Sequence, residues 1–489
     1  MKNVILIMVD QWRGDCLSID GHPVVHTPFL DELALRGVRF RHAYSATPTC
    51  IPARAALMTG LSARNHGRVG YQDGVDWTYP TTLAGEFTRQ GYQTQAVGKM
   101  HVWPVRNRLG FDNVILHDGY LPYSRRHHPD IETMDDYVPW MRNQLGYPAD
   151  DIDHGVHCNS WVARPWDKPE HVHPTNFVTT QAVQFLKRRD PTKPFFLYMS
   201  YHRPHPPFDP PQWAFDQYQD REMPDPPVGD WVTELHSEWR QRNNPPLGAG
   251  HPEAFIGQLS EVNLRRARAG YYGLMTHIDH QIKRLIDHLI HHNLYDNTVI
   301  CFVSDHGEMM GDHHMLRKGY PYMGSIRIPF IYVDPTDDRI PTGTVRDEVV
   351  ELRDVMPSLL DSAGLEIPDT LDGQSILPRI HGQSSKWRDA LHGEHILFGE
   401  SIQWLTNGRE KYIWSSKTGR EQFFNLDDDP QETRNLAGQP VVAPRLNDWR
   451  QRLIEALSDR DEQFTDGHQL LVDQPVQATL PSILSNRKV

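Results

Sequence analysis

A short apolar run near the start of the chain constrains the fold more than any other sequence feature. Residues 4–9 are all aliphatic apart from Met8, and Asp10 closes the run. A continuous apolar run of this length, without alternation of polar residues, is typical of a strand buried on both faces in a parallel sheet. Parallel strands need crossover connections, which are usually helices. The run therefore predicts an α/β fold.

Further apolar runs alternate with helical patterns over the first two thirds of the chain. This alternation predicts a doubly wound, mostly parallel sheet flanked by helices. Ligands bind such sheets beyond the carboxyl ends of the strands, so residues 98–101, 202–205 and 304–306 should share one edge with Asp10. The expected strands are 94–97, 195–200, 298–304 and 328–333, and the expected helices are 27–36, 83–89, 177–188 and 261–291.

The length of 489 residues allows about three domains, or one large α/β domain and a smaller one. We expect a catalytic α/β domain over residues 1–370 and a smaller C-terminal α+β domain over residues 371–466. The smaller domain should contain strands at 396–400, 411–415 and 422–426 and a helix near 447–457. Two polar inserts, at about 121–173 and 206–252, should form long loops over the site. Residues 467–489 should form an extended tail that docks elsewhere, and the tail is a candidate arm between chains of a homo-oligomer.

Charge and composition exclude several classes of partner and location. Lys plus Arg total 50 against 63 for Asp plus Glu, so the net charge is -13 and neither nucleic acid nor an anionic membrane is a favoured partner. No segment resembles a membrane span or the apolar core of a signal peptide. The 4 cysteines are irregularly spaced, which indicates neither a disulfide framework nor a CxxC zinc site and favours the cytoplasm.

The segment from Cys50 to Arg54 is the sharpest local motif of the chain. Pro52 suits the first turn of a helix, and residues 53–58 are good helix formers. Cys50 should therefore lie at a helix N-terminus, where an anion meets free N–H groups and the positive end of the helix dipole. Arg54, one turn further on, adds a positive charge. The alternative is a buried cysteine beside a helix start, without any chemistry.

This motif resembles the Cys/Ser-x-Pro-x-Arg signature of the sulfatases of the alkaline phosphatase superfamily, whose cysteine is oxidised to formylglycine. The resemblance covers most of residues 1–335 and implies hydrolysis of small anionic sulfate esters after maturation by a formylglycine-generating enzyme. The other matching positions are Asp10, residues 27–31, 37–40, 98–101, 203–205 and 304–308, Lys318, and residues 424–426, 429–432 and 435–437.

A metal site is the next expectation. Asp10 and Asp305 should end separate strands, and each precedes a neutral ligand, Gln11 and His306. Helix capping or turn formation would also explain such aspartates. The resemblance implies that these positions and Cys50 hold one divalent metal, although the family frequently has Asp and Asn where this chain has Gln11 and His306. Oxygen ligands favour Ca²⁺, whereas the imidazole leaves Mn²⁺ open.

The remaining candidate catalytic groups are basic. Lys99 and His101 should face the same side if their strand continues. In a cleft beside Cys50, Lys99 would bind the anion and His101 would take a proton from the hydrated nucleophile; the alternative is a solvated Lys-x-His at the start of a loop. The resemblance implies that Lys318 binds the sulfate and that His205 protonates the leaving alcohol. His202 is expected to be a loop residue. Four further residues are weaker candidates for the site: Arg64, His66, His313 and His314.

The resemblance implies a covalent sulfo-enzyme, formed on the hydrated formylglycine with Arg54 and the metal stabilising its alkoxide. The alternative enzyme is a phosphonate monoester or phosphodiester hydrolase of the same superfamily, which residues 9–13, 65–66 and 304–314 also resemble. That branch generally lacks the Lys-x-His pair at Lys99 and His101, so the pair favours a sulfatase. A catalytically silent binding module would be expected to lack several of these groups.

Overall fold

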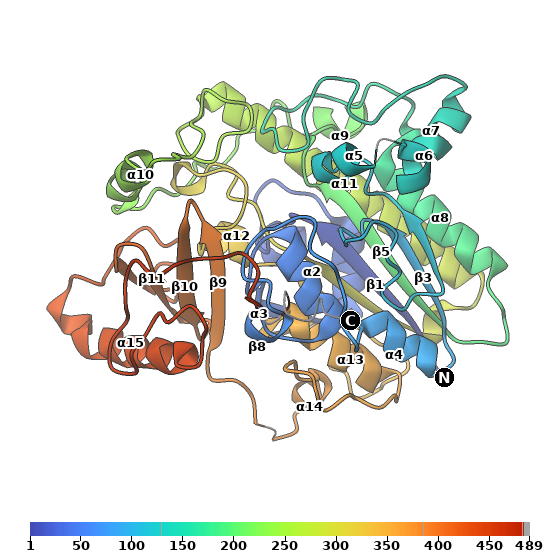
Figure 1. Cartoon of the computed structure of the whole chain (residues 1–489). Coiled ribbons are helices and arrows are strands. Elements are labelled where there is room, and N and C mark those ends of the chain that lie inside the picture. Colours follow the sequence, from blue (N-terminus) through green and yellow to red (C-terminus); the bar gives the residue numbers. More distant parts are fainter. Residues whose placement is uncertain (129, 385, 482, 484–489) are drawn as a thin grey trace.

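A sheet of 8 strands in the order β4-β3-β5-β1-β6-β7-β2-β8 forms the centre of the molecule (Figure 1). The computed structural model describes residues 1–128, 130–384, 386–481 and 483. β1 is parallel to β5 and β6, β3 is parallel to β4 and β5, and β2 is parallel to β8. The strands are β1 (Asn3–Asp10), β2 (Val38–Tyr44), β3 (Gln93–Gly98), β4 (Asn113–Leu116), β5 (Phe195–Pro204), β6 (Thr298–Ser304), β7 (Phe330–Val333) and β8 (Thr344–Glu351). The predicted doubly wound, mostly parallel sheet is confirmed.

β7 is the exception, because it runs antiparallel to both β6 and β2. Parallel neighbours need a crossover over one face of the sheet, usually a helix of several turns. Between β6 and β7 the longest helix is α12 (Met323–Ile326), of 4 residues. The chain therefore stays at the carboxyl end of β6 and returns directly, and this returning segment carries much of the site.

The central strand β1 is buried on both faces, which explains its continuous apolar run. Ile5, Ile7 and Val9 pack in one core with α1 (Pro28–Leu35), α8 (Pro174–Arg188) and α11 (Glu261–His291). Val4, Leu6 and Met8 pack in a second core with α2 (Cys50–Thr59), α4 (Leu83–Arg89) and α13 (Val355–Ser362). The helices thus cover both faces of the sheet (Figure 1).

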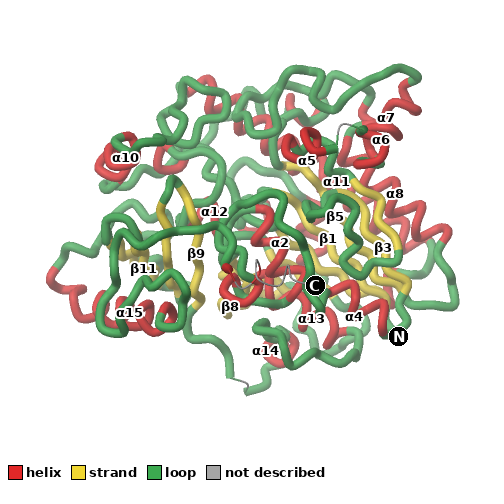
Figure 2. Tube along the Cα trace, in the orientation of Figure 1, coloured by secondary structure: helices red, strands yellow, loops and turns green. Residues whose placement is uncertain are grey.

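The two inserts are partly helical rather than loops throughout (Figure 2). The first contains α5 (Pro122–His127), α6 (Ile131–Met134) and α7 (Tyr137–Leu145), and the second contains α9 (Gln212–Asp216) and α10 (Val232–Arg240). Met134, Tyr137, Val138 and Met141 are buried. Within α7, the spacing of three and four residues that relates Tyr137 and Val138 to Met141 is helical, but Pro139 inside the segment and the two aspartates before it hide the pattern.

A second sheet, of 4 antiparallel strands in the order β12-β11-β10-β9, forms a small C-terminal domain. Its elements are β9 (Leu391–Leu397), β10 (Glu400–Thr406), β11 (Glu410–Ser415), β12 (Glu421–Asn425) and α15 (Ala443–Leu457). The strand expected at 396–400 is wrong, because Phe398 and Gly399 form the turn between β9 and β10 with φ of 50 and 78°. Phenylalanine rarely adopts a positive φ, so the apolar residues concealed this turn.

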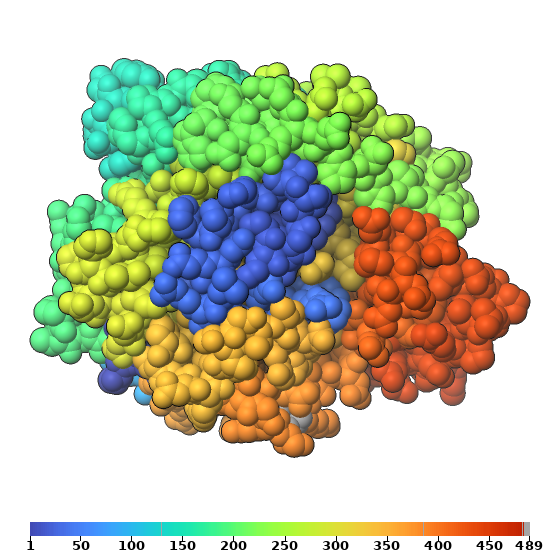
Figure 3. Space-filling model, turned by 180° about the vertical axis from the view of Figure 1, so that it is seen from behind, coloured from blue at the N-terminus to red at the C-terminus, as the bar shows by residue number. Residues whose placement is uncertain are grey.

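The C-terminal domain lies beside the larger body, as the view from behind shows in orange and red (Figure 3). The tail then returns to α3 (Ala63–His66), where the carbonyl of Ala478 accepts the N–H groups of Val69 and Gly70. The part of the predicted tail at 482 and 484–489 lies outside the described residues. α14 (Leu377–Ile380) is the remaining α-helix of the described chain. None of the described helices combines the length and apolarity of a membrane span.

Candidate active site

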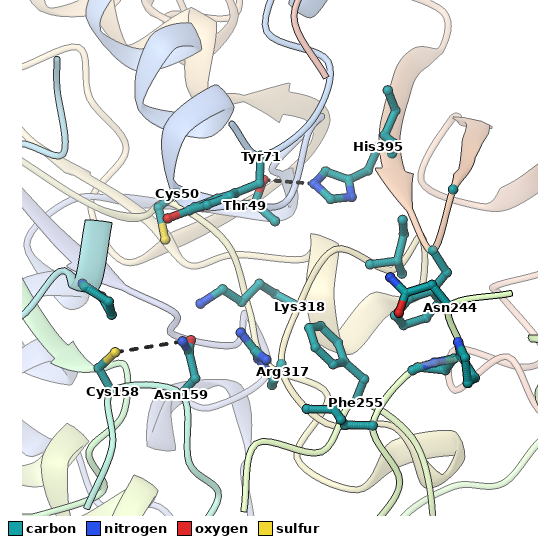
Figure 4. Close-up of a pocket in the computed structure, with 18 of the residues that line it drawn as sticks. Thr49, Cys50, Tyr71, Cys158, Asn159, Asn244, Phe255, Arg317, Lys318 and His395 are labelled. Atoms are coloured by element: carbon teal, nitrogen blue, oxygen red, sulfur yellow. Dashed lines mark hydrogen bonds between the residues drawn. The ribbon is translucent and has the colours of Figure 1, made fainter. Parts of the chain in front are cut away.

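Cys50 is the first residue of α2, and its side chain is buried, as the motif predicted for a helix N-terminus. Thr49 precedes the helix in an extended conformation, but its hydroxyl does not cap the helix. That hydroxyl instead hydrogen-bonds Nε2 of His395 at 2.9 Å (Figure 4). The N–H groups of the first turn are therefore left to an anion bound near Cys50.

Two carboxylates and an imidazole converge on the sulfur of Cys50. One ligand atom from each of Asp10, Cys50, Asp305 and His306 lies within 4.8 Å of all the others, and all four residues are buried. The adjacent parallel strands β1 and β6 bring this about, because Asp10 ends β1 and Asp305 follows β6. The predicted shared edge of the sheet thus places these residues together.

The donor set of this cluster fits a divalent cation. Nδ1 of His306 donates to the carbonyl of Gly307 at 3.0 Å, so the Nε2 lone pair points into the cluster. That Nε2 lies 3.6 Å from a carboxylate oxygen of both Asp10 and Asp305 and 3.3 Å from Sγ of Cys50. A second nitrogen fixed by a backbone carbonyl is the usual arrangement of a metal-binding histidine.

Gln11, the other predicted ligand, has a positive φ of 72° at the end of β1. Its backbone N–H donates to Asp305 at 3.0 Å. Its side-chain oxygen accepts a hydrogen bond from Nζ of Lys318 at 2.5 Å, and its side-chain nitrogen donates to Glu308. Gln11 thus links the carboxylate cluster to Lys318, and its role as a ligand stays a prediction.

Cations surround the carboxylates. Arg54 is fully buried behind them and donates to Asp305 from Nε at 3.1 Å, while Lys99 pairs with Asp10. Burial opposes ionisation of Asp10, but Lys99 and its neighbours outweigh burial and hold the pKa of Asp10 well below its usual range. Burial and Asp10 likewise oppose the Cys50 thiolate, yet Lys99 and Lys318 lower the pKa of this thiol well below its usual value. The site is locally positive within an acidic protein.

Lys318 and His205 form a pair that lines the same cavity as Cys50. Nζ of Lys318 lies 2.7 Å from Nε2 of His205, whose Nδ1 donates to the carbonyl of Pro206 at 2.9 Å. The backbone N–H of His205 donates to the carbonyl of Asp10 at 3.0 Å. These bonds hold the imidazole so that Nε2 is the nitrogen directed at Lys318.

Lys99 and His101 both line the same cavity as Cys50, although β3 ends at Gly98 and the expected strand does not continue. The carboxylate of Asp118 instead holds the segment by accepting the N–H groups of Met100 at 3.1 Å and His101 at 2.8 Å. His101, with a φ of 55°, places Nε2 3.5 Å from a carboxylate oxygen of Asp73.

The expectation that His202 is a loop residue is wrong, because His202 belongs to β5, where its ring stacks on Tyr120 with 3.3 Å between ring centroids. Arg64 pairs with Asp459 at the surface, and Nδ1 of His66 accepts the N–H of Arg68. None of the four weaker candidates belongs to the described lining of the cavity, namely Arg64, His66, His313 and His314.

The cavity that Cys50 lines has a volume of about 870 Å³ (Figure 4). Sequence reasoning missed most of its wall. His395 reaches it from β9 of the small domain, Phe255 from the loop before α11, and Asn159 and Asn244 from the two inserts. No local motif marks these residues, because segments far apart in the sequence supply them.

Comparisons with known proteins agree with this geometry. The model of the family named Sulfatase matches residues 2–365. The chain belongs to the sulfatase family. The model for the C-terminal region of N-sulphoglucosamine sulphohydrolase also matches, over residues 311–459. Members of the family are sulfuric ester hydrolases, and membership implies a metal ion and a formylglycine, which the buried cluster around Cys50 fits.

Two curated relatives cover nearly the whole of this sulfatase. An arylsulfatase of Clostridium perfringens is 47% identical over 479 residues, 97% of this chain and 98% of its own. A multifunctional alkaline phosphatase superfamily protein of Trinickia caryophylli is 31% identical and covers 95% of this chain and 97% of its own. Both alignments run through the catalytic body and the small C-terminal domain.

Among solved structures, the phosphonate monoester hydrolase of Agrobacterium radiobacter superposes with a TM-score of 0.74. It is 26% identical and covers 98% of this chain and 99% of its own. A structure solved in complex with its substrate D-glucosamine-2-N,6-O-disulfate has a TM-score of 0.73 at 20% identity, with 94% of this chain and 99% of its own covered, and shows the fold alone.

Proposed function

We propose that this protein hydrolyses organic sulfate monoesters, aryl sulfates among them, with Cys50 in its formylglycine form. The observation that carries the proposal is that Cys50, which the buried carboxylates surround, lines one cavity together with the Lys318–His205 pair. The 47% identity to an arylsulfatase supports the choice of aryl esters. We also propose that a formylglycine-generating enzyme acts on Cys50 during maturation.

Asp10, Asp305, His306 and residue 50 would hold a divalent ion, with Gln11 as a further candidate ligand. When bound, the ion would supply Lewis-acid stabilisation of the nucleophilic oxygen that hydrated formylglycine provides. We propose Ca²⁺, because carboxylate and amide oxygens dominate the donor set, and Mn²⁺ is the alternative that the imidazole of His306 allows. Arg54 donates a hydrogen bond to Asp305 and so holds this carboxylate in position.

The cations of the chain bind the sulfate group. Lys99 and Lys318 lie on the cavity wall with Cys50, and each offers an ammonium to a non-bridging sulfate oxygen. Charge that develops on the sulfate oxygens is stabilised by these fixed groups, which need no reorganisation during the reaction. The site thus concentrates positive charge where a sulfate monoester carries its single negative charge.

The two histidines move protons. Nε2 of His205 is held toward Lys318, and burial, followed by Lys318, lowers the pKa of His205 well below its usual value. His205 is therefore neutral at rest with its Nε2 lone pair toward Lys318, and the proton that it passes to the departing alcohol comes from the Lys318 ammonium. Burial and Lys99 oppose protonation of His101, but Asp73 and Cys50 outweigh them and raise its pKa. A raised pKa makes His101 the better base, so it accepts the proton that leaves the residue-50 hydroxyl.

Hydrolysis of phosphonate monoesters or phosphodiesters is the second candidate. It is favoured by the similarity to the phosphonate monoester hydrolase of Agrobacterium radiobacter and to the multifunctional relative. Such substrates place a carbon or alkoxy group where a sulfate has an oxygen. Lys99 would then keep its pair with Asp10 but lose the substrate oxygen that accepts its other N–H donors, which disfavours these esters.

The other partner and location predictions remain proposals from the sequence. These are a cytoplasmic location, the absence of nucleic-acid and membrane partners, and a homo-oligomer joined by the C-terminal tail. Within the described tail, the backbone bonds of Ala478 and Leu480 join residues 67–70 of the same chain.

The test of the proposed function is turnover of 4-nitrophenyl sulfate by the purified full chain, with peptide mass analysis of residue 50 in the same preparation. We expect turnover in proportion to the fraction of aldehyde, and none above background for Cys50→Ala. Full activity in protein that carries only the unmodified thiol would refute the proposal. Faster turnover of phenyl phosphonates than of the matching aryl sulfate would promote the second candidate.

A further inference from the structure

The cavity holds a positive charge that neither the metal cluster nor the sulfate-binding groups account for. Arg317 immediately precedes Lys318 and lines the same cavity. Its side chain lies between Lys318 and Phe255 (Figure 4), and its guanidinium carbon is 4.0 Å from the centroid of the Phe255 ring. Arg317 is therefore placed beside a substrate whose sulfate group Lys318 binds.

This guanidinium lacks an acidic partner within the described part of the chain. Its side-chain hydrogen bond goes from Nη1 to the carbonyl of Glu253 at 3.5 Å, the limit of such a bond. The carboxylate of Glu253 pairs with His157 instead. The nearby carboxylate of Glu308 accepts the backbone N–H of Arg317 at 2.5 Å, not its side chain.

Arg242 provides the contrast, because it lines the same cavity but is fully paired. It donates to Glu238 at 2.9 Å and to the carbonyl of Phe398 at 2.9 Å, and it lies 3.0 Å from Glu400. An arginine in the cavity wall can thus form ion pairs in this fold, whereas Arg317 forms none with the described residues, although Glu253 and Glu308 lie near it.

An unpaired, partly desolvated charge has an energetic cost unless a ligand compensates it. Burial lowers the pKa of Arg317, which means that its surroundings disfavour the charged form. Its backbone also has a φ of 68°, a conformation that bulky residues rarely adopt. The strain and the missing partner together indicate a site prepared for an anion, since the guanidinium fork binds carboxylates and sulfates in bidentate fashion.

We propose that the alcohol part of the substrate carries a second anionic group, a carboxylate or a second sulfate, and that Arg317 binds it. The inference rests on the proposed function and narrows its substrate class. Tyr71, Phe255 and Phe398 supply aromatic surface in the cavity wall for a ring between the two anions. Asn159 lines the same cavity as Arg317 and offers a second polar group, an amide donor, to the substrate.

The experiment compares three aryl sulfates that differ in one ring substituent: a carboxylate, a second sulfate ester and a neutral carboxamide. The carboxamide matches the carboxylate in shape, so the ratio of their kcat/KM values isolates the charge. Each ester is tried with the substituent at the 2-, 3- and 4-position. The full chain is used, with the aldehyde at residue 50 verified by mass.

For the wild type we expect the best carboxylate or disulfate isomer to exceed its carboxamide counterpart roughly 30-fold in kcat/KM, the value of one charge-assisted bidentate contact, or about 2 kcal/mol. Arg317→Asn, chosen because asparagine tolerates a positive φ, should reduce this ratio to about 1. Arg317→Lys should retain part of it. Arg242→Gln, which removes a paired charge from the same wall, should leave the ratio as in the wild type.

The outcomes separate this inference from the function on which it rests. A wild-type ratio near 1 for every isomer, with good turnover of all the esters, would overturn the role of Arg317 alone. An equal ratio in the wild type and in Arg317→Asn would do the same. No turnover of any ester by aldehyde-bearing protein would overturn the proposed function itself. A preference for the carboxylate over the disulfate, or the reverse, identifies which anion Arg317 binds.

Discussion

Replacing His205 by alanine tests how the site protonates a leaving group. The histidine has two contacts that matter: Nδ1 donates to the carbonyl of Pro206 at 2.9 Å, and Nε2 faces Nζ of Lys318 at 2.7 Å. The first contact orients the ring, and the second places Nε2 beside a sulfate-binding ammonium. His205→Ala therefore removes a proton donor and one hydrogen-bond partner of Lys318.

These two losses differ in their dependence on the substrate. The lost partner of Lys318 costs about 1 kcal/mol, or roughly 5-fold in kcat/KM, for every ester. The lost proton donor matters only when the alcohol leaves poorly, where general acid catalysis contributes about 10²- to 10⁴-fold. We thus expect His205→Ala to be about 5-fold slower with 4-nitrophenyl sulfate and roughly 10³-fold slower with an unactivated alkyl sulfate.

The assay is a plot of log kcat/KM against the pKa of the leaving alcohol for the wild type and the variant. The slope should become steeper in His205→Ala. His395→Gln is the matched control, because His395 lines the same cavity but bonds Thr49, so any loss should be equal for all esters. Parallel plots for the wild type and His205→Ala would refute the assignment of His205 as the proton donor.

Three further predictions follow from the same geometry. Asp305→Ala should lose both bound metal and activity, and elemental analysis after dialysis checks this, since an active metal-free enzyme would contradict the cluster's role. Lys99→Ala should reduce the ratio of kcat/KM for aryl sulfate to that for phenyl phosphonate by about 10-fold or more, because the ammonium donors that a phosphonate leaves unsatisfied are gone; an unchanged ratio would count against Lys99 as the discriminating group. Burial and then Arg68 lower the pKa of His66 to about 3. Between pH 6.5 and 3 this histidine is therefore protonated in the unfolded chain but neutral in the folded protein. The free energy of unfolding of the wild type should therefore fall, relative to that of His66→Asn, by about 1.4 kcal/mol per pH unit below 6.5, which denaturant midpoints at pH 7 and 5 measure; a constant difference would contradict the buried neutral imidazole.

The sequence predicts the helices and strands well where one local pattern is enough to identify the element. β1 is buried on both faces, as the uninterrupted apolar residues 4–9 indicate, and α11 has the bounds of the helical pattern at 261–291. It predicts poorly where tertiary contacts override local signals. The turn at Phe398 and Gly399 follows two apolar residues, and only the pairing of β9 with β10 reveals it.

The residues of the site likewise fall into those that the sequence could locate and those that it could not. Asp10, Cys50 and Asp305 could be located because each follows or begins a regular element whose end must lie at one edge of the sheet. Arg317 and His395 could not, because one lies in a loop with no periodicity and the other in a strand of the small domain. Which segments of a chain face one cavity depends on long-range packing, which local patterns do not encode.

The position of β1 in the sheet has a consequence for synthesis on the ribosome. This first strand pairs on one side with β5, where Val4 meets Phe196, and on the other with β6, where Val4 meets Val299. At roughly 5 to 20 residues per second, the second partner emerges about 15 to 60 s after the strand itself. During that interval a fully apolar strand has open edges, a state prone to intermolecular pairing. We expect the nascent chain to bind holdase chaperones until residue 304 has left the exit tunnel, and truncations ending before β6 to aggregate.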